Sequence, residues 1–174
     1  MFFLVERTES VSVLPKHFSS TLKEHVVNQL KKKLEGRSIG NFGYTILVTT
    51  MIDMSSGKLR DYTGEAEFEV RYLSLIFRPF IGEVLFAQVT VVNQNGFFAE
   101  AGPVTIFVGI QQIPKEYNLD NAESVPSFVM EEEDLRISVG TLVRIKIIGM
   151  RLEVSSEDIP VVGTINENYL GPAE

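Results

Sequence analysis

The sequence predicts an α+β protein in which a helix packed on an antiparallel sheet is followed by a second, strand-rich part. Three observations support this prediction. A four-residue apolar spacing predicts one amphipathic helix, because such a spacing keeps the apolar side chains within one stripe. Alternating apolar and polar residues predict strands before and after the helix. Asn95-Gly96 lies between two apolar runs and predicts a β-hairpin, since both residues adopt positive φ at little cost.

The first part of the chain holds the helix. Residues 2–14 alternate loosely and predict a strand that ends at Pro15. The helix is expected to follow a capping box from Thr21 to Glu24 and to stop at Gly36. Lys31 to Lys33 lie in the last turns, where cations complement the helix dipole, so we interpret them as a solvated helix end and not as a nucleic-acid patch. The apolar stripe consists of Phe18, Leu22, Val26, Leu30 and Leu34.

Two longer strands complete the first sheet. The segments Tyr44 to Met54 and Glu65 to Phe80 predict these strands. Residues 53–64 between them are polar and predict an exposed loop. Leu73 to Phe77 is more apolar throughout, as expected for a strand covered on both faces. One helix among such strands packs on one face of a small antiparallel sheet.

The boundary between the two parts lies near Phe80-Ile81-Gly82, where the sequence has no flexible linker. We therefore expect rigidly joined domains at residues 1–80 and 81–174. In the second domain, further strands are predicted at Leu142 to Met150 and at Val161 to Ile165.

Composition argues against catalysis and against a metal site. The chain has no cysteine and only two histidines, His17 and His25, whose spacing of eight does not match a His-x3-His metal pair. Pro114 to Asp134 is expected to be irregular, and its acidic run Glu131 to Asp134 lacks the ligand spacing and glycine of a calcium loop. We predict no catalytic residue, no metal and no cofactor, although the carboxylates leave an enzyme as a remote alternative.

Charge is distributed unevenly along the chain. Residues 1–80 carry 11 Lys and Arg against 9 Asp and Glu, whereas residues 81–174 carry 5 against 14, a net charge of −9. Phosphate binding depends on Lys and Arg, so strong RNA binding by the second domain alone is not expected. No apolar run approaches the ~18 residues that span a bilayer, and the N-terminus lacks the basic region of a signal peptide, so we expect a soluble intracellular protein.

Exposed aromatic rings beside basic residues are the usual elements of single-strand binding. Phe97 and Phe98 are the candidate stacking residues, and strand alternation allows at most one of them to point outward. Arg144 and Lys146, on one face of a predicted strand, are the candidate phosphate contacts.

Several short motifs occur in a specific order and spacing. Gly82-x-Val84, followed by Val89, Val92, Gly96, Phe98 and Gly102, resembles the opening of an S1 RNA-binding domain, a five-stranded OB barrel. Over nearly its whole length the chain is similar to the family of the seventh subunit of eukaryotic RNA polymerase II, which has a counterpart in archaeal RNA polymerase. Further motifs of the resemblance are Phe77-Arg78-Pro79-Phe80, Gly82-Glu83-Val84, Gly96-Phe97-Phe98, Gly102-Pro103 and Tyr169-Leu170-Gly171.

The resemblance implies a truncated RNP-like domain followed by an S1-type OB barrel. It also implies a non-catalytic nuclear stalk subunit that pairs with the polymerase's fourth subunit, docks on the core near the RNA exit, aids initiation and binds nascent single-stranded RNA. RNA binding is expected to be weak, because Asn95 stands where many S1 domains have a stacking aromatic. The expected core-docking residues are Pro15, His17, Phe18, Asp53, Lys58, Leu59 and Arg60. The expected partner-subunit interface consists of Phe2, Phe3, Leu75, Phe77 and Phe80.

Two other functions remain open at this point. The equivalent stalk subunit of another nuclear polymerase shares the architecture, and a free-standing S1-type RNA-binding protein shares the barrel. The acidic barrel and the directly joined N-terminal domain favour the polymerase subunit over the free-standing protein.

Overall fold

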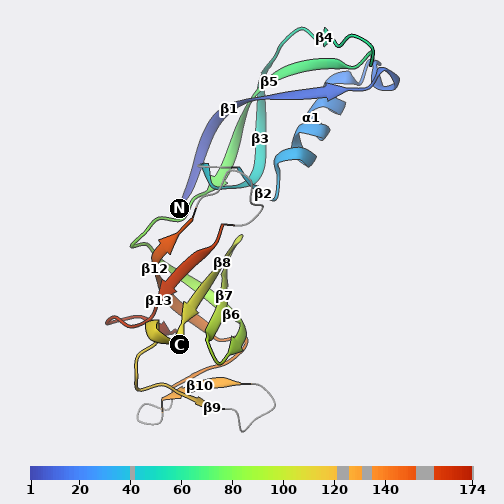
Figure 1. The fold of residues 1–174 in the computed structure, drawn as a ribbon. Helices are drawn as coiled ribbons and strands as arrows, with labels where there is room; N and C mark the ends of the chain where they lie inside the picture. The colour runs from blue at the N-terminus through green and yellow to red at the C-terminus, as the bar shows by residue number, and fades with distance from the viewer. Residues whose placement is uncertain (40–41, 121–125, 131–134, 152–158, 174) are drawn as a thin grey trace. The chain divides into compact units, whose positions relative to one another are not determined.

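The computed structural model describes residues 1–39, 42–120, 126–130, 135–151 and 159–173. The chain folds as two compact units, Met1–Arg78 and Pro79–Glu174 (Figure 1). Their border lies two residues before the one expected from the sequence. Among the described residues, no helix combines the length and the apolar character needed to cross a membrane.

The first unit is an antiparallel sheet with one helix. Its strands follow the order β1 (Phe2–Val13), β5 (Ala66–Phe77), β3 (Tyr44–Met54) and β2 (Arg37–Ser38), and the short β4 (Lys58–Leu59) also pairs with β5. The three long strands match the expected segments to within three residues at each end. β5 alternates clearly, whereas β1 alternates loosely and β3 is a run of residues that favour strands.

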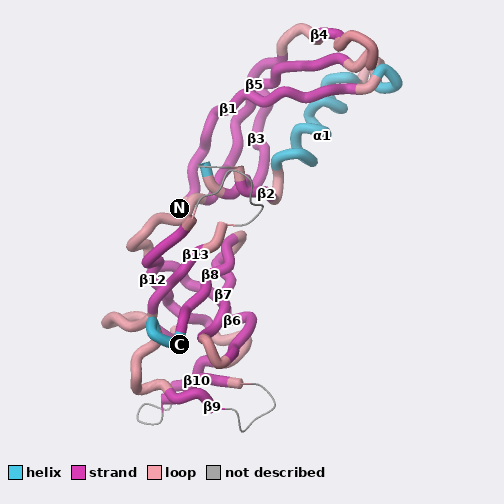
Figure 2. The backbone as a smooth tube through the Cα atoms, viewed as in Figure 1, coloured by secondary structure: helices cyan, strands magenta, loops and turns pink. Residues whose placement is uncertain are grey.

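Helix α1 (Leu22–Leu34) covers one face of this sheet and contacts β1 and β3 (Figure 2). Val11 pairs with Phe68 and Val13 with Ala66, so odd residues of β1 and even residues of β5 share this face. Leu30 and its neighbours on the apolar stripe pack against it. The buried core of the unit comprises Val11, Val13, Val26, Leu30, Leu34, Val48, Ala66, Phe68, Val70 and Tyr72.

The start of α1 differs from the predicted capping box. Thr21 is the N-cap residue, but its side chain makes no capping hydrogen bond. Its hydroxyl instead bonds the Ser19 hydroxyl at 2.8 Å, and the Ser19 Oγ accepts a hydrogen bond from the Thr21 backbone N–H. The prediction was wrong because a nearby serine competes for the same group. The predicted stop is confirmed, since Gly36 has a φ of +77°.

The segment predicted as an exposed loop, residues 53–64, is partly strand. Asp53 belongs to the end of β3, and Lys58 and Leu59 of β4 pair with Glu67 and Ala66 of β5. Polar composition indicated a loop, but backbone pairing at the edge of a sheet does not require apolar side chains.

The second unit is a closed barrel of five strands. These are β6 (Val84–Asn93), β7 (Gly96–Ala101), β8 (Val104–Gly109), β12 (Leu142–Met150) and β13 (Val161–Thr164). Neighbours follow the order β13-β8-β7-β6-β12, and β13 also pairs with β12, which closes the ring. The β13–β8 pair is parallel and the others are antiparallel. This topology confirms the predicted α+β fold with an OB-type barrel.

The predicted hairpin joins β6 to β7, but its turn lies one residue earlier than expected. Asn93 pairs with Gly96, so Gln94 and Asn95 form the turn. Gly96 has another role: a Cβ atom there would lie 2.0 Å from the carbonyl oxygen of Val108. Glycine is therefore needed for the close approach of β7 to β8.

Pro114 to Asp134 is not wholly irregular. Asn118–Asp120 (β9) and Ser127–Met130 (β10) join Leu135–Ile137 (β11) in a three-stranded sheet. These strands are too short for an alternation signal. The acidic run 131–134 lies outside the described residues.

Candidate nucleic-acid and protein interfaces

The two candidate stacking rings point to opposite sides of the barrel wall. Phe97 is 0% exposed and packs in the core, with its ring centroid 6.5 Å from that of Phe128. It cannot stack on a base, so the expectation for Phe97 is corrected. Phe98 is partly exposed, and its ring centroid lies 4.9 Å from that of Phe107 on β8. Phe98 and Phe107 together form the aromatic surface of this side.

A shallow hollow of about 400 Å³ adjoins this aromatic pair. Phe107, Ile148 and Val162 give it an apolar wall, and Val162 of β13 pairs directly with Phe107. Amide side chains of Asn95, Gln111 and Gln112 add hydrogen-bonding groups. Such a surface can hold a planar base against its apolar atoms, while the amide side chains hydrogen-bond to the edge of the base. The sequence did not predict the hollow, because its residues come from four separate segments.

The structure does not place the two basic candidates at the aromatic pair. Arg144 and Lys146 precede Ile148 of the hollow by four and two residues, or about 13 and 7 Å along β12. The Arg144 guanidinium lies 5.7 Å from the centroid of the exposed Phe86 ring. Lys146 Nζ donates hydrogen bonds to both carboxylate oxygens of Glu167, at 2.7 and 2.9 Å. Each cation is thus already engaged within the protein.

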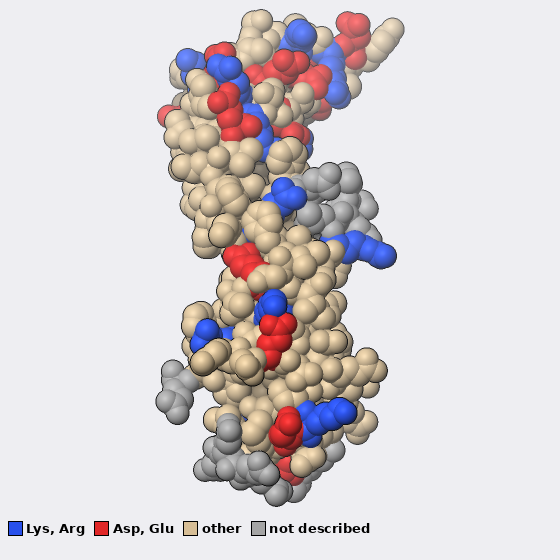
Figure 3. Space-filling model, turned by 90° about the vertical axis from the view of Figure 1, so that its left-hand side faces the viewer, with Lys and Arg blue, Asp and Glu red and all other residues tan. Residues whose placement is uncertain are grey.

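Charged side chains do not form a continuous basic surface on the face shown in Figure 3. Lys and Arg are interspersed there with Asp and Glu, and uncharged surface separates them. A single-strand binder with high affinity tracks the phosphate backbone along a basic groove. No such groove is visible in this view.

Two predicted docking segments meet at one end of the first unit. Pro15 begins the 3-10 turn η1 (Pro15–His17), and a Cβ placed on Gly64 would lie 3.5 Å from its Cγ. Leu59 is 70% exposed at this end, and Tyr62 is fully exposed with a positive φ of +70°. Such a backbone conformation is strained for tyrosine and is typical of functional loops. Tyr62 lies within the loop 53–64 that was expected to dock, but it was not singled out, because neither its backbone conformation nor its exposure leaves a sequence signal.

The other expected docking residues vary in availability. Phe18 and Lys58 are exposed. Arg60 makes a 3.2 Å ion pair with Glu67, and Asp53 Oδ1 accepts a hydrogen bond from the backbone N–H of Met54. His17 is engaged by the second histidine, as described below.

The face of the first sheet opposite α1 carries an apolar patch at one end. Phe2 and Leu4 are 62% and 61% exposed, and they pair with Phe77 and Leu75. The Phe2 and Phe77 rings contact edge to face at a centroid distance of 5.1 Å. We call Phe2, Leu4, Leu47 and Leu75 the open-face patch. Phe77 is on the same face but lies against the Phe2 ring and is only 5% exposed, so the expectation that it contacts a partner is corrected.

Not every predicted interface residue belongs to the open-face patch. Phe3 points to the opposite side of the sheet, because its neighbours Phe2 and Leu4 occupy the open face. Phe80 belongs to the second unit. Leu4 and Leu47 were not predicted, since sequence periodicity does not indicate which face of a sheet lacks a covering element.

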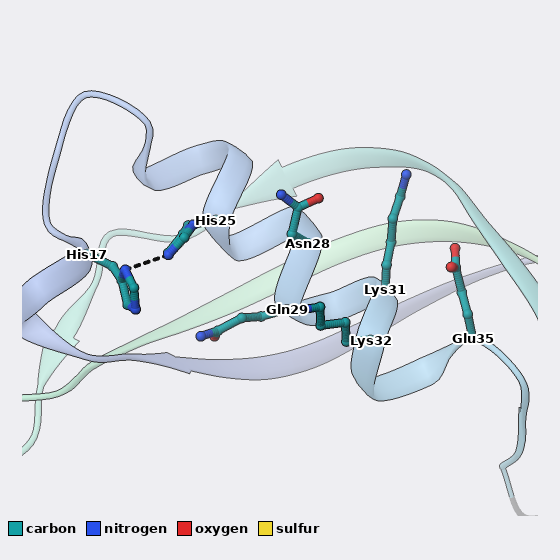
Figure 4. Close-up of a pocket in the computed structure, with 7 residues that line it drawn as sticks. All are labelled: His17, His25, Asn28, Gln29, Lys31, Lys32 and Glu35. Atoms are coloured by element: carbon teal, nitrogen blue, oxygen red, sulfur yellow. Dashed lines mark hydrogen bonds between the residues drawn. The ribbon is translucent and has the colours of Figure 1, made fainter.

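The chain's two histidines form a contact that their spacing did not predict. The turn η1 folds back toward α1, so His17 Nδ1 lies 2.5 Å from His25 Nε2 and the ring centroids are 3.9 Å apart (Figure 4). Partial burial, His25 and Lys16 lower the pKa of His17. The pair lines a hollow of about 690 Å³ together with Asn28, Gln29, Lys31, Lys32 and Glu35.

Both units match known protein families. Residues 8–64 match the "SHS2 domain found in N terminus of Rpb7p/Rpc25p/MJ0397", and residues 78–157 match the "S1 RNA binding domain". The order of the two matches is the order of the two units in the structure.

Relatives that align with most of this chain identify the family more closely. "DNA-directed RNA polymerase II subunit rpb7" of Dictyostelium discoideum is 40% identical over 98% of both chains. "DNA-directed RNA polymerase II subunit 7" of Arabidopsis thaliana is 39% identical over 98% of this chain and 96% of the relative. "DNA-directed RNA polymerase V subunit 7" of the same plant is 30% identical over 84% of this chain and 82% of the relative. The chain therefore belongs to the family of RNA polymerase II subunit 7, RPB7.

Proposed function

We propose that this chain is a non-catalytic stalk subunit of nuclear RNA polymerase II. In this proposal the open-face patch pairs with the fourth subunit, the end with Leu59 and Tyr62 docks on the polymerase core near the RNA exit, and the barrel contacts nascent RNA. The observation that supports this proposal most strongly is the alignment of 98% of this chain, across both domains, with subunits of RNA polymerase II. Of the two Arabidopsis relatives, the polymerase II subunit is more similar to this chain than the polymerase V subunit, at 39% against 30% identity. This difference favours polymerase II.

The side-chain chemistry supports a role without catalysis. The sequence holds no cysteine, and its two histidines contact each other. Among the residues that the structure describes, no three His, Cys, Asp or Glu side chains are grouped to hold a metal ion. Thiol nucleophiles and metal centres with three protein ligands depend on such groups.

Docking on the core can be tested at the exposed end of the first unit. We expect the double variant Leu59→Asp, Tyr62→Ala to lose association with core polymerase that lacks its stalk. Both side chains are exposed, so the fold should be retained. Co-purification of the reconstituted complex measures association. Ser56→Asp adds the same charge to an exposed position in this segment and should bind normally. Unchanged association of the double variant would remove this end from the docking surface.

RNA binding can be tested at the aromatic pair. Phe98→Ala should weaken binding of a single-stranded oligonucleotide by about 5- to 150-fold, because stacking on an aromatic ring contributes ~1–3 kcal/mol per base. Phe86→Ala removes an exposed ring on another strand and is the matched control. We expect micromolar affinity or weaker and a shallow salt dependence, with a slope near −0.7 per phosphate contact.

The same titration separates the proposal from its main alternative. Nanomolar affinity, or a salt slope that corresponds to about six contacts or more, would indicate a free-standing RNA-binding protein. Unchanged binding by Phe98→Ala would place the RNA elsewhere on the barrel, and equal losses in both variants would extend the site to Phe86.

A further inference from the structure

We propose that His17 and His25 form a two-imidazole binding site for a divalent transition metal ion of the Zn²⁺ and Cu²⁺ class. The site joins the turn η1 to helix α1 at the end of the first unit where the predicted docking segments meet. Metal binding here does not depend on assembly with a polymerase, so it can be tested on the chain alone.

The two ring nitrogens lie close together, although the rings are tilted against each other, with their centroids 3.9 Å apart. His25 Nε2 and His17 Nδ1 face each other at 2.5 Å, and a single proton between them satisfies both (Figure 4). Replacing that proton by Zn²⁺ requires metal–nitrogen distances of about 2.0–2.1 Å, which at a tetrahedral angle separate the nitrogens by ~3.3 Å. The nitrogens must therefore separate by about 0.8 Å, and the tilted rings must also turn so that both lone pairs point at the ion. No residue of η1 is buried, so the turn can accommodate this movement.

The direction in which the pKa of His17 is shifted is compatible with metal binding. An imidazole binds a metal only in its neutral form. The pKa of His17 is lowered by partial burial and by the charges of His25 and Lys16. This direction favours the neutral ring, whose lone pair can bind a metal. Metal binding should be lost as the pH falls through the imidazole range, because protons compete for the same nitrogens.

The surroundings determine which metal ions fit. Lys16 on η1 and Lys31 and Lys32 on α1 add positive charge. Glu35, the carboxylate among the residues that line the hollow, follows His25 by ten residues or about 15 Å along the helix. Mg²⁺ and Ca²⁺ require oxygen ligands and therefore find no suitable site. Zn²⁺ and Cu²⁺ bind imidazole well and are thus favoured.

The remaining ligand positions can be filled without a third histidine. Gln29 lies one helical turn after His25, and its side chain extends toward the side of α1 on which His17 lies (Figure 4). Its amide oxygen, or water, can complete the coordination. With two imidazole ligands the ion should exchange readily, unlike a structural zinc with four protein ligands.

The test uses the untagged full chain, since an oligohistidine tag would bind the same ions. We expect Zn²⁺ and Cu²⁺ to bind with a stoichiometry of one in calorimetry at pH 7.5, and EDTA to reverse the binding. The chain has two histidines, so its imidazole nitrogen NMR spectrum reports on the site alone. Zn²⁺ should shift the signals of both rings, whereas Mg²⁺ should shift neither.

Matched variants separate a metal site from a simple hydrogen-bonded pair. His17→Gln and His25→Gln should each weaken Zn²⁺ binding by about tenfold or more, because each removes one of two imidazole ligands. Lys32→Gln removes a cation but no ligand and should bind Zn²⁺ as tightly as the wild type or more tightly. A dissociation constant on the order of 1 mM or above, unshifted imidazole signals, or unchanged binding in both histidine variants would overturn the proposal.

Discussion

Phe97→Ala is expected to destabilise the barrel by about 3–5 kcal/mol, the usual cost of removing a buried phenylalanine ring. Phe97 has no exposed surface and lies in the barrel core beside Phe128. Its truncation would leave a cavity inside a closed ring of strands, where neighbouring backbone cannot collapse easily. Because domains of this size are stabilised by only ~5–15 kcal/mol, a large part of the barrel's stability would be lost.

Phe98→Ala is the matched control for this prediction. Phe98 is the adjacent residue on the same strand, but its ring lies on the outer side against Phe107. Its removal should cost about 0.5–1.5 kcal/mol for the lost contact between the two rings. The loss of buried apolar surface adds a smaller cost, because the Phe98 ring is partly exposed. Urea unfolding followed by circular dichroism measures the difference, and the absence of tryptophan rules out tryptophan fluorescence as the probe. Equal destabilisation by the two variants would contradict the assigned orientation of β7.

The elements that the sequence predicted well are those with long periodic patterns. The strands at Tyr44–Met54 and Leu142–Met150 have the predicted bounds, and α1 follows the predicted apolar stripe. For Leu142–Met150 and α1, burial of one face imposes the pattern, so the sequence carries it directly. The short strands β9 and β10 contain too few residues for such a pattern.

The interfaces were harder to predict, because they depend on what covers each surface. Alternation indicated that Phe97 and Phe98 point in opposite directions, but not which of them faces the core. The contact of His17 with His25 depends on the path of a short turn, and the exposure of Tyr62 depends on a strained backbone. Such features arise from tertiary structure and leave no fixed spacing in the sequence.

Leu4→Glu is expected to abolish pairing with the proposed fourth-subunit partner while the chain stays folded. Leu4 is 61% exposed in the open-face patch, on the edge strand β1 and opposite Leu75 on β5. A charge at this position costs little in the free protein, because water can hydrate it. In a complex the same carboxylate would be buried without a partner, and burial of an unpaired charge is strongly unfavourable.

A change on the same face of the same strand provides the control for Leu4→Glu. Thr8→Glu introduces the same side chain four residues further along β1, opposite Arg71 and outside the open-face patch. Pairing should therefore survive in Thr8→Glu and fail in Leu4→Glu, as measured by co-expression and size-exclusion chromatography of the two-subunit complex. Circular dichroism of the free chains should show the same fold for both variants. If Leu4→Glu still formed the complex with normal affinity, the partner would have to bind another surface, and the exposure of Phe2 and Leu4 would need a different explanation.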